Sequence, residues 1–417
     1  MPNQGLPYLK QLLNRKRTRI NTRYNFYEMK NQVRDLDLVR NSGMWALKAS
    51  LGWCAKAVDS LADRLQVRGW KNDNFNLAQI FQMNNSDVLF DSAILSALIS
   101  SCCFIYISED ETGFPRLQVI DGYDATGIID PVTNLLKEGY AILEKDKNGK
   151  PALEAYFKTG ETMFYPAGAE PYIIPNNAPA PLLVPILYRP DARRPFGHSR
   201  ISRAMMAITE GAVRTLKRSE ISAEFYSFPQ RYALGTDPEA EPLNKWKATI
   251  STLLEISKDT EGDKPTLGQF TQQSMQPFMD QIRTFASLFA GETGLTMDDL
   301  GFISDNPSSA EAIKASHESL RVLAEKAQRT FGACFLNVGY IGACLRDNFA
   351  YQRRQFYLTE LQWKPAFKPD AAALSGIGDG AIKLNQAVPG YFNADNLSDL
   401  TGIKPSEMEP VINDAEN

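Results

Sequence analysis

A chain of 417 residues is too long for one simple compact domain and is expected to hold two or three domains. Its apolar and charged fractions, 43% and 23%, are those of an average soluble globular protein, which excludes the wholly disordered and fibrous classes. The formal net charge of -4 argues against a protein that holds nucleic acid through a broad basic surface. Any contact with DNA should therefore be light.

The cysteines and the longest uncharged stretch bear on the cellular compartment. Five cysteines are an odd number without paired metal-ligand spacing, which favours reduced thiols in a cytosol over a disulfide framework. The first ten residues carry Pro2 and Pro7 and no apolar core, so no secretory signal is expected there. The stretch Ser92–Ser108 changes from helical to β-type spacing, which predicts a buried helix and a buried strand and no membrane span.

The N-terminal segment Lys10–Arg40 mixes many cations with aromatic residues, which indicates a basic helical arm. A helix with a solvated charged face explains the same pattern equally well. Between Trp45 and Leu65, apolar residues recur at helical spacing and predict a packed helix. The tetrapeptide Val67–Trp70 then reads VRGW and predicts a turn into a new segment.

The next region, Phe104–Tyr188, contains short β-type runs separated by Gly, Pro, Asn and Asp, and these predict an antiparallel sheet. The runs are Leu117–Ile120, Gly127–Ile129, Tyr140–Leu143, Ala155–Phe157 and Tyr172–Ile174. A proline-rich stretch, Pro171–Pro195, is expected to end the sheet region.

Two helices are predicted to flank a small βαβ-like insert. The first helix runs from Ile201 to about Tyr226, and the second runs from about Met275 to Gly291, with Gly291 and Gly294 as its stop. The insert consists of a strand at Arg231–Gly235, a helix at about Pro242–Ile256 and a strand at Thr266–Thr271.

The most regular apolar pattern runs from Ser308 to Arg346, and an unbroken helix of that length would span about 58 Å. Pro307 suits the first turn of this helix, and Ser308 can cap its free N–H groups. Three shorter elements are expected beyond it. They are a strand around Tyr357–Trp363, a helix around Asp379–Val388 and a helical turn near Asn396–Leu400.

Several kinds of chemistry are poorly supported. Only two histidines, His198 and His317, are present, which argues against a histidine-rich metal site or a Ser-His-Asp device. No P-loop sequence occurs, so ATP hydrolysis through a P-loop is not expected. The GIGDGA sequence at 376–381 matches a dinucleotide-binding pattern but lacks the preceding strand.

Two sets of carboxylates are the remaining candidates for chemistry. The loop aspartates Asp298, Asp299 and Asp305 are better explained as a solvated acidic loop than as a metal site. A multidomain hydrolase or transferase would have its site near Asp121, Tyr123 and Asp124, but those residues lack a nucleophile-base pairing. No catalytic residue, metal ligand or cofactor is predicted.

Taken in order, five groups of segments resemble the portal proteins of tailed double-stranded-DNA phages, in the branch found in long-tailed phages of Gram-positive hosts. The segments are WCAKAVD at 53–59 with LQVRGW at 65–70, FGHSRI at 196–201, EFYSFPQRYALG at 224–235, NPSSAEAI at 306–313, and DGAIKL at 379–384 with AVP at 387–389. The chain departs from the family pattern in a short C-terminal region and in His198, where a small residue is expected.

The resemblance implies an α+β phage portal fold with an α/β wing, a two-helix stem, a small α/β clip, a long wing helix and a short, mainly helical crown. The implied boundaries are 1–197 for the N-terminal arm and wing, 198–227 and 274–292 for the stem helices, 228–273 for the clip, 293–307 for the tunnel loop region, 308–369 for the long wing helix and wing return, and 370–417 for the crown.

The function implied by the resemblance is a non-enzymatic conduit for double-stranded DNA. Such a protein forms a ring, usually of twelve subunits, at the unique capsid vertex of the virion, and is assembled in the host cytoplasm. Its partners would be DNA, the terminase, a head-completion adaptor, and the major capsid and scaffolding proteins, without a membrane. A capsid-associated scaffold or adaptor without a channel is the alternative from the same setting.

The resemblance also implies three sets of functional residues. The tunnel loop would place Ser304, Asp305, Asn306, Pro307 and Ser308 at the DNA channel; the stem would contribute Arg214, Lys217, Arg218 and Arg283; and the clip would dock partners through Arg231, Lys245, Trp246 and Lys247. Because strong neutralisation of phosphates would stall a sliding duplex, short polar side chains and a mildly acidic subunit suit a channel.

Overall fold

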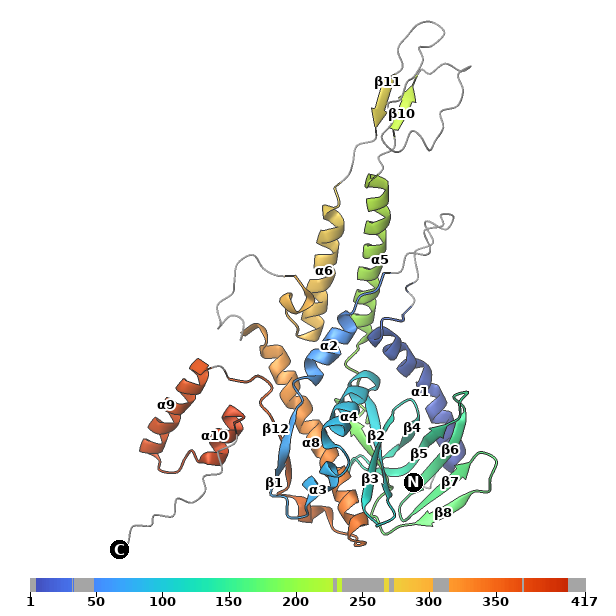
Figure 1. Cartoon of the computed structure of the whole chain (residues 1–417), viewed down its shortest axis with the longest axis vertical. Helices are drawn as coiled ribbons and strands as arrows, with labels where there is room; N and C mark the ends of the chain where they lie inside the picture. The colour runs from blue at the N-terminus through green and yellow to red at the C-terminus, as the bar shows by residue number, and fades with distance from the viewer. Residues whose placement is uncertain are drawn as a thin grey trace. The chain divides into compact units, whose positions relative to one another are not determined.

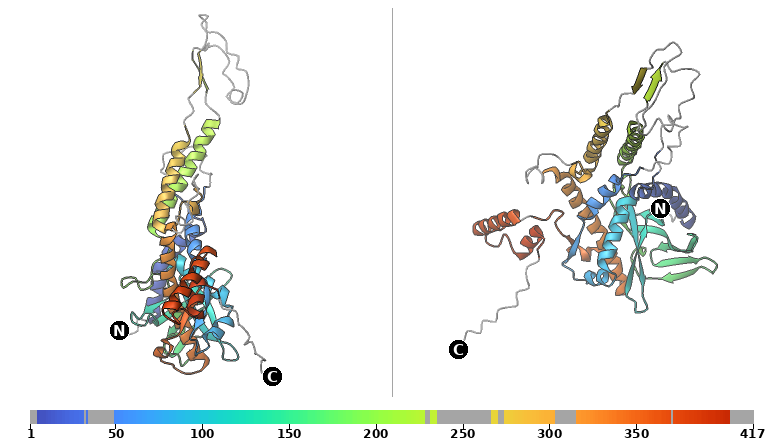
Figure 2. Two further views of the ribbon diagram at one scale, coloured as in Figure 1. Left: turned by 90° about the vertical axis from the view of Figure 1, so that its left-hand side faces the viewer. Right: turned by 45° about the horizontal axis from the view of Figure 1, so that its top comes forward.

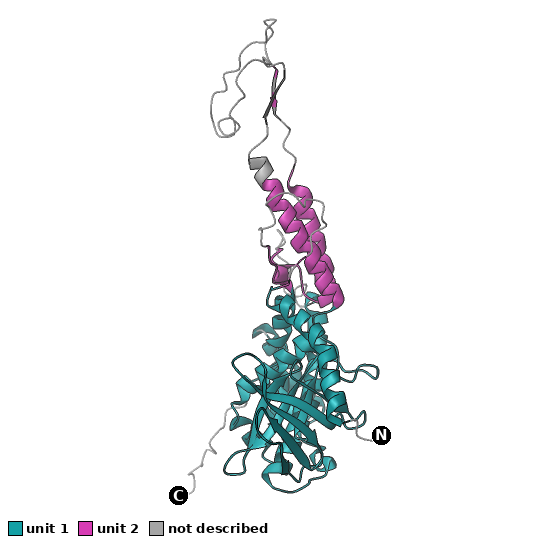
Figure 3. Cartoon of the chain, turned by 90° about the vertical axis from the view of Figure 1, so that its right-hand side faces the viewer, with its two compact units in different colours: residues 1–30, 54–202, 307–417 teal, residues 31–53, 203–306 magenta. Residues whose placement is uncertain are grey.

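The structure is a computed structural model that describes residues 5–31, 33, 49–227, 231–234, 266–269, 274–302, 315–369 and 371–403. The chain divides into two compact units (Figure 3). The first unit comprises Met1–Lys30, Cys54–Ser202 and Pro307–Asn417, and the second comprises Asn31–Trp53 and Arg203–Asn306. Both helices and strands are present, which confirms the predicted α+β class.

Among the described residues, the strands of the first unit pair entirely in antiparallel fashion, in three groups (Figure 1). One sheet has the order β4-β5-β6-β7-β8, a second has the order β3-β2-β9, and β1 pairs with β12. The strands are β1 Val67–Lys71, β2 Cys102–Glu109, β3 Pro115–Asp121, β4 Ala125–Ile129, β5 Leu136–Lys145, β6 Pro151–Lys158, β7 Glu161–Pro166, β8 Tyr172–Pro175, β9 Leu183–Leu187 and β12 Glu360–Trp363.

The five predicted β-type runs are confirmed as β3, β4, β5, β6 and β8. The expectation that the proline-rich stretch ends the sheet region is confirmed, because the fully buried β9 lies within that stretch, ends at Leu187, and is followed by helix α5 as the next described element. Pro185 stands opposite Phe104 of β2. Since β9 pairs with a strand on one side only, a residue without an N–H can be accommodated at this edge.

The predicted turn at Val67–Trp70 was also wrong. This segment is the strand β1, with a bulge between Val67 and Gly69, and its partner β12 follows almost 300 residues later. A bulge glycine flanked by polar residues resembles a turn when only the local sequence is read, because the partner strand is not visible there.

The helices of the first unit are α1 Gly5–Tyr27, α2 Trp53–Ala62, α3 Leu77–Gln82, α4 Ser86–Ser100, α8 Glu318–Arg346, α9 Ala371–Ala387 and α10 Ala394–Thr401, with a short 3-10 helix, η3, at Arg353–Phe356. Helix α2 begins at Trp53, which the division assigns to the second unit. Helix α4 leads directly into β2, which confirms the predicted buried helix and strand between Ser92 and Ser108. Helix α1 packs against β4 and β5 of the five-stranded sheet (Figures 1 and 2).

Helix α8 forms much of the core of the first unit. The predicted long helix is confirmed from Glu318 to Arg346, with a turn at His317 before it, and its expected start at Ser308 lies outside the described residues. Nearly every residue from Phe331 to Leu345 is buried. The apolar stripe at Phe331–Leu345, which was expected to serve either a subunit interface or the core, therefore fills the core of its own unit.

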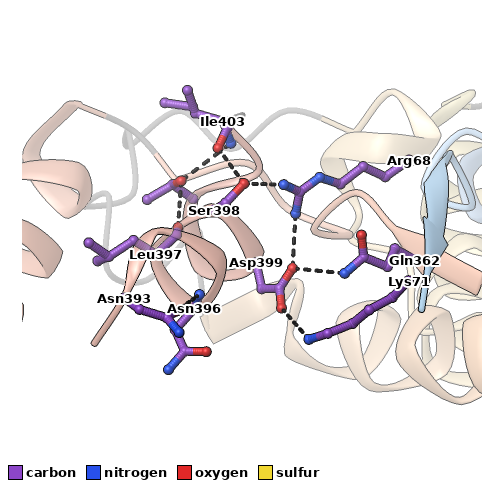
Figure 4. A network of polar contacts seen from close by, with 10 residues as sticks. Arg68, Lys71, Gln362, Asn393, Asn396, Leu397, Ser398, Asp399 and Ile403 are labelled. Atoms are coloured by element: carbon purple, nitrogen blue, oxygen red, sulfur yellow. Dashed lines mark hydrogen bonds and ion pairs between the residues drawn. The ribbon is translucent and has the colours of Figure 1, made fainter. Parts of the chain in front are cut away.

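The C-terminal helix α10 is held against β1 and β12 by a polar network (Figure 4). Arg68 reaches Asp399 at 3.0 Å and donates a hydrogen bond to Ser398, and Lys71 lies 3.8 Å from the second oxygen of Asp399. Gln362 of β12 donates a further hydrogen bond to Asp399 at 3.3 Å. Because α9 buries only Ala381, this network is a principal attachment of the C-terminal helices.

The second unit contains α5 Arg203–Ser227, α6 Gln276–Thr293, a 3-10 helix, η2, at Asp298–Leu300, and a hairpin of β10 Arg231–Leu234 and β11 Thr266–Gln269. The two strands are antiparallel, so the predicted βαβ-like insert was wrong, since that motif needs parallel strands. Helix α6 ends at Gly294, whose φ of 72° supplies the left-handed cap, and Gly291 lies within the helix. The predicted helix at Pro242–Ile256 falls outside the described residues.

Two further sequence expectations concern thiols and membranes. All five cysteines are buried, and none of them is in a disulfide. Within the described ranges, no helix combines the length and apolar character needed to cross a bilayer.

Candidate functional site

The candidate stem site is built on the antiparallel helices α5 and α6. A Cβ added at Gly211 of α5 would lie 2.9 Å from the ring of Phe285 of α6, and Thr215 donates a hydrogen bond to Gln281 at 3.1 Å. Residues with higher numbers on α5 thus face residues with lower numbers on α6, so the two helices run antiparallel. The glycine lets a bulky aromatic ring approach the backbone, which fixes the register of the pair.

The buried faces of the pair follow helical spacing on both sides. The buried residues are Met205, Thr209, Ala212, Val213 and Thr215 on α5, and Ile282, Ala286, Phe289, Ala290 and Thr293 on α6. Many of these side chains are small, so the two backbones can lie close together over several turns. The sequence periodicity that predicted both helices reflects this shared apolar seam.

Three of the four predicted stem cations lie on one face of α5. Arg214, Lys217 and Arg218 follow the i, i+3, i+4 spacing of neighbours on a helix surface, opposite the centre of the buried seam. Arg214 lies 3.9 Å from Glu210, one turn earlier, and Arg218 is exposed. The predicted residues therefore form a short cationic stripe, which we call the α5 stripe.

The fourth stem cation, Arg283, is exposed on α6. Together the sequences of α5 and α6 carry five cations and five carboxylates, so the helix pair has no net charge. Side chains of this kind can meet phosphates one at a time through exposed guanidinium groups without neutralising a duplex. The arrangement suits weak, sequence-independent contact.

The other two predicted sets are largely outside what the structure describes. The backbone of Arg231 lies in β10, opposite Gln269, but its side chain lies outside the described residues. The remaining clip residues, Lys245, Trp246 and Lys247, and all five tunnel-loop residues, Ser304 to Ser308, also lie outside them. Their assigned roles stay predictions.

The basic helix α1 differs from both interpretations of its sequence. Most of its cations are used within the first unit: Lys16 donates to the carbonyl of Ala125 at 2.6 Å, Arg17 to that of Tyr123 at 2.9 Å, and Arg23 to that of Ser100 at 3.1 Å. Lys10 forms an ion pair with Glu154. Burial lowers the pKa of Lys16.

This docking of α1 was not predicted from the sequence. The signal for it was the spacing of Leu9, Leu13 and Ile20, all at most 2% exposed, which marks a core-facing stripe on a helix rich in charge. The helix is thus a packed element of the first unit, neither a free arm nor a helix whose cations all face solvent.

The carboxylates of the rival enzyme site have structural partners. Asp121 accepts hydrogen bonds from the Tyr24 hydroxyl at 2.8 Å and from the Tyr123 amide at 2.7 Å, and burial raises its pKa. Asp124 pairs with Arg17 at 3.2 Å and with Lys145. These contacts join α1 to the turn between β3 and β4, so the acidic cluster has a structural role.

The acidic loop after α6 and the GIGDGA sequence also have simple structural explanations. Asp299 accepts hydrogen bonds from the amide and hydroxyl of Thr296, both at 2.9 Å. The GIGDGA sequence lies inside helix α9, so it does not form the strand-to-helix turn of a dinucleotide site. In the part of the chain that the structure describes, no group of three or more His, Cys, Asp or Glu residues could hold a metal ion.

Comparisons with known proteins give two related sequences. The chain is 25% identical over 334 residues to the portal protein of Mycobacterium phage L5, covering 75% of this chain and 68% of that protein. It is 26% identical over 350 residues to the portal protein of Mycobacterium phage D29, covering 76% of this chain and 69% of that protein. No family profile matches the chain.

Two solved structures are also similar. The virion of the native gene transfer agent particle matches with 14% identity and a TM-score of 0.46, covering 85% of this chain and 90% of that chain. The neck of the native particle, computed with C12 symmetry, matches with 15% identity and a TM-score of 0.45, covering 93% and 100%.

The fold is a mixed helix-and-sheet architecture with an antiparallel helix pair, and three of the predicted stem cations lie on one face of α5. Over three quarters of its length the sequence is similar to phage portal proteins. The resemblance predicted from the ordered motifs is thereby confirmed.

Proposed function

We propose that this chain is the portal subunit of a tailed double-stranded-DNA phage. It forms a ring at the unique capsid vertex and acts as a conduit for DNA in genome packaging and ejection, without catalysis of its own. The observation that carries the proposal is the similarity to two proteins named portal protein across 75% and 76% of this chain. The terminase and the head-tail connector would dock on the same ring.

The proposed assignment of the portal regions follows the two units. The helices α5 and α6 are the stem, residues 228–273 are the clip that faces the terminase and later the adaptor, and residues 293–307 are the tunnel loop region. The first unit holds the wing, with α8 as its long helix, and α9 and α10 are the crown. This assignment is supported by the order of the motifs along the chain.

The zero net charge of the two stem helices supports a conduit that binds DNA only weakly. A duplex carries about one negative charge per 1.7 Å, and binding strength grows with each phosphate neutralised. A helix pair with equal numbers of cations and carboxylates neutralises few phosphates and therefore binds the duplex weakly. The α5 stripe and Arg283 would offer DNA brief contacts that break as it moves.

The mass of the purified protein tests the proposed assembly. Twelve copies of the 46.6 kDa chain make a particle of about 560 kDa, the size expected of a closed cyclic ring with this number of subunits. We expect mass photometry of the full chain to show one dominant species near that mass. A sample that stays monomeric or dimeric at micromolar concentration would contradict the proposal.

A further inference from the structure

The outward face of α1 carries two arginines that the first unit does not use. Arg15 and Arg19 are exposed and lie one turn apart, and neither forms an ion pair with another described residue. Helix α1 contains no Asp or Glu, so nothing on the helix itself balances them. Its other four cations already contact acceptors elsewhere in the unit.

The nearby carboxylates are also occupied. Asp124 pairs with Arg17 and Lys145, Asp121 accepts from Tyr24, and Glu154 binds Lys10 and the hydroxyl of Tyr140. The positive charge of Arg15 and Arg19 is therefore not cancelled by the acids that face α1. An otherwise acidic chain presents here a local cationic surface.

The side chains around the two arginines indicate which kind of partner fits. The exposed residues of this face are Gln11, Asn14, Thr18, Asn21 and Thr22, all of them polar. The large exposed apolar residues of this segment, Tyr8 and Met29, lie at its two ends, 39% and 46% exposed. A stable protein interface usually needs an apolar, desolvated centre, whereas a phosphate backbone needs only hydrogen-bond donors.

The face is also held rigidly. Leu9, Leu13, Ile20 and Phe26 anchor the opposite side of α1 in the core, each at most 5% exposed. Four residues of helix advance about 6 Å, close to the rise of two nucleotides along the duplex axis, about 6.8 Å. Two guanidinium groups at this spacing can each meet a phosphate of the same strand.

We propose that the α1 face, defined by Gln11, Asn14, Arg15, Thr18, Arg19 and Thr22, binds the phosphate backbone of duplex DNA without sequence preference. This deepens the proposed function, on which it rests, by adding a DNA contact in the first unit to the contacts assigned to the stem. Two arginines per subunit give weak, salt-sensitive binding, which repetition around a ring would strengthen.

The test compares DNA binding by the full chain with and without these charges. A fluorescent 30-base-pair duplex is titrated with wild type and with R15Q/R19Q at several salt concentrations, and the slope of log affinity against log salt is measured. We expect the double variant to bind more weakly at low salt and its slope to fall by about 0.9 for each phosphate that it no longer neutralises. R15K/R19K should retain most of the wild-type slope, because it keeps both charges.

A matched control separates a local contact from a general charge effect. Arg354 is exposed in the first unit and has no ion pair with another described residue, so R354Q changes the net charge at a distant surface and should leave the slope unchanged. An unchanged slope in R15Q/R19Q would overturn the proposal. Loss of the oligomer in R15Q/R19Q would also overturn it, because the face would then be a contact between subunits.

The mass of each sample keeps this test apart from the test of the proposed function. If wild type forms no ring, the portal assignment fails, yet the difference in salt slope between wild type and R15Q/R19Q still decides whether the α1 face binds DNA. If the ring forms and the slopes agree, only the α1 proposal fails.

Discussion

Gly197 shows how one residue of a sequence motif is dictated by backbone geometry. Its φ is 76°, and a Cβ at this position would lie 2.1 Å from the carbonyl oxygen of Tyr188. The following residues fasten the chain to the end of α4: Ser199 donates to the carbonyl of Ile99 at 2.6 Å, and the amide of Arg200 donates to that of Leu98 at 2.8 Å. The FGHSRI motif is thus a tightly packed connection.

His198, which departs from the family pattern, fits beside this glycine without strain in the core. Its ring is partly exposed, with Nε2 2.5 Å from Asp191, and this hydrogen bond lowers the pKa of Asp191. The bulk that was unexpected in the sequence is accommodated at the surface.

The substitution Gly197→Ala should destabilise the protein strongly. A left-handed conformation costs an alanine roughly 1–2 kcal/mol, and displacing the Tyr188 carbonyl adds a packing cost of roughly 1–3 kcal/mol. Gly168→Ala is the matched control, because Gly168 has a φ of 82° with nothing within 4 Å of an added Cβ. Urea unfolding should show a larger loss for Gly197→Ala; equal losses would mean that the close approach to Tyr188 is relieved without cost.

The residue types of the candidate sites could be predicted from the sequence, but their partners could not. Arg214, Lys217 and Arg218 were named from the resemblance, and helix α5 places them on one face. The six cations of α1 look alike in sequence, and the fold alone separates them, because Lys16 and Arg17 reach backbone carbonyls more than 100 residues away. No local pattern encodes such acceptors.

At the level of elements, helices and strands were predicted correctly where the local sequence has a clear apolar periodicity. Strands that depend on pairing with a distant segment were missed. The helices α4, α5 and α6 and the strands β3 to β6 were predicted because their apolar periodicity is local. The strands β1 and β9 were missed because β1 contains a bulge glycine and β9 contains a proline, and both residues are typical of turns. Only the pairing with β12 and β2 identifies these segments as strands.

The polar network of Figure 4 predicts how firmly α10 is attached. Asp399→Asn removes the charge that pairs with Arg68 and Lys71, while keeping the shape of the side chain. Because the Asp399 side chain is 44% exposed, the loss should be below about 1 kcal/mol. Hydrogen exchange in residues 394–401 should quicken while that of α8 stays unchanged.

Asp379→Asn is the control for this experiment, since Asp379 is exposed on α9 and has no ion pair with another described residue. It should leave exchange in α10 at the wild-type rate. If Asp399→Asn also exchanged at the wild-type rate, the apolar contacts of α10 would be the real attachment.

On the scale of the whole molecule, the stem cations are expected to act on moving DNA and not on assembly. The triple variant R214Q/R218Q/R283Q leaves the buried seam of α5 and α6 intact, so the ring should form with the wild-type mass. Packaging of DNA into capsids should slow, because a more negative channel repels the duplex. The control K326Q changes an exposed cation of α8 and should package normally. A triple variant that fails to assemble would show that these cations are interface residues.

The central claim, that copies of this chain surround a channel for DNA, is tested most directly by electron microscopy of the purified full-length protein. We expect closed rings with an axial opening wide enough for a duplex. Particles without an axial opening, or a uniform population of monomers or dimers, would contradict it.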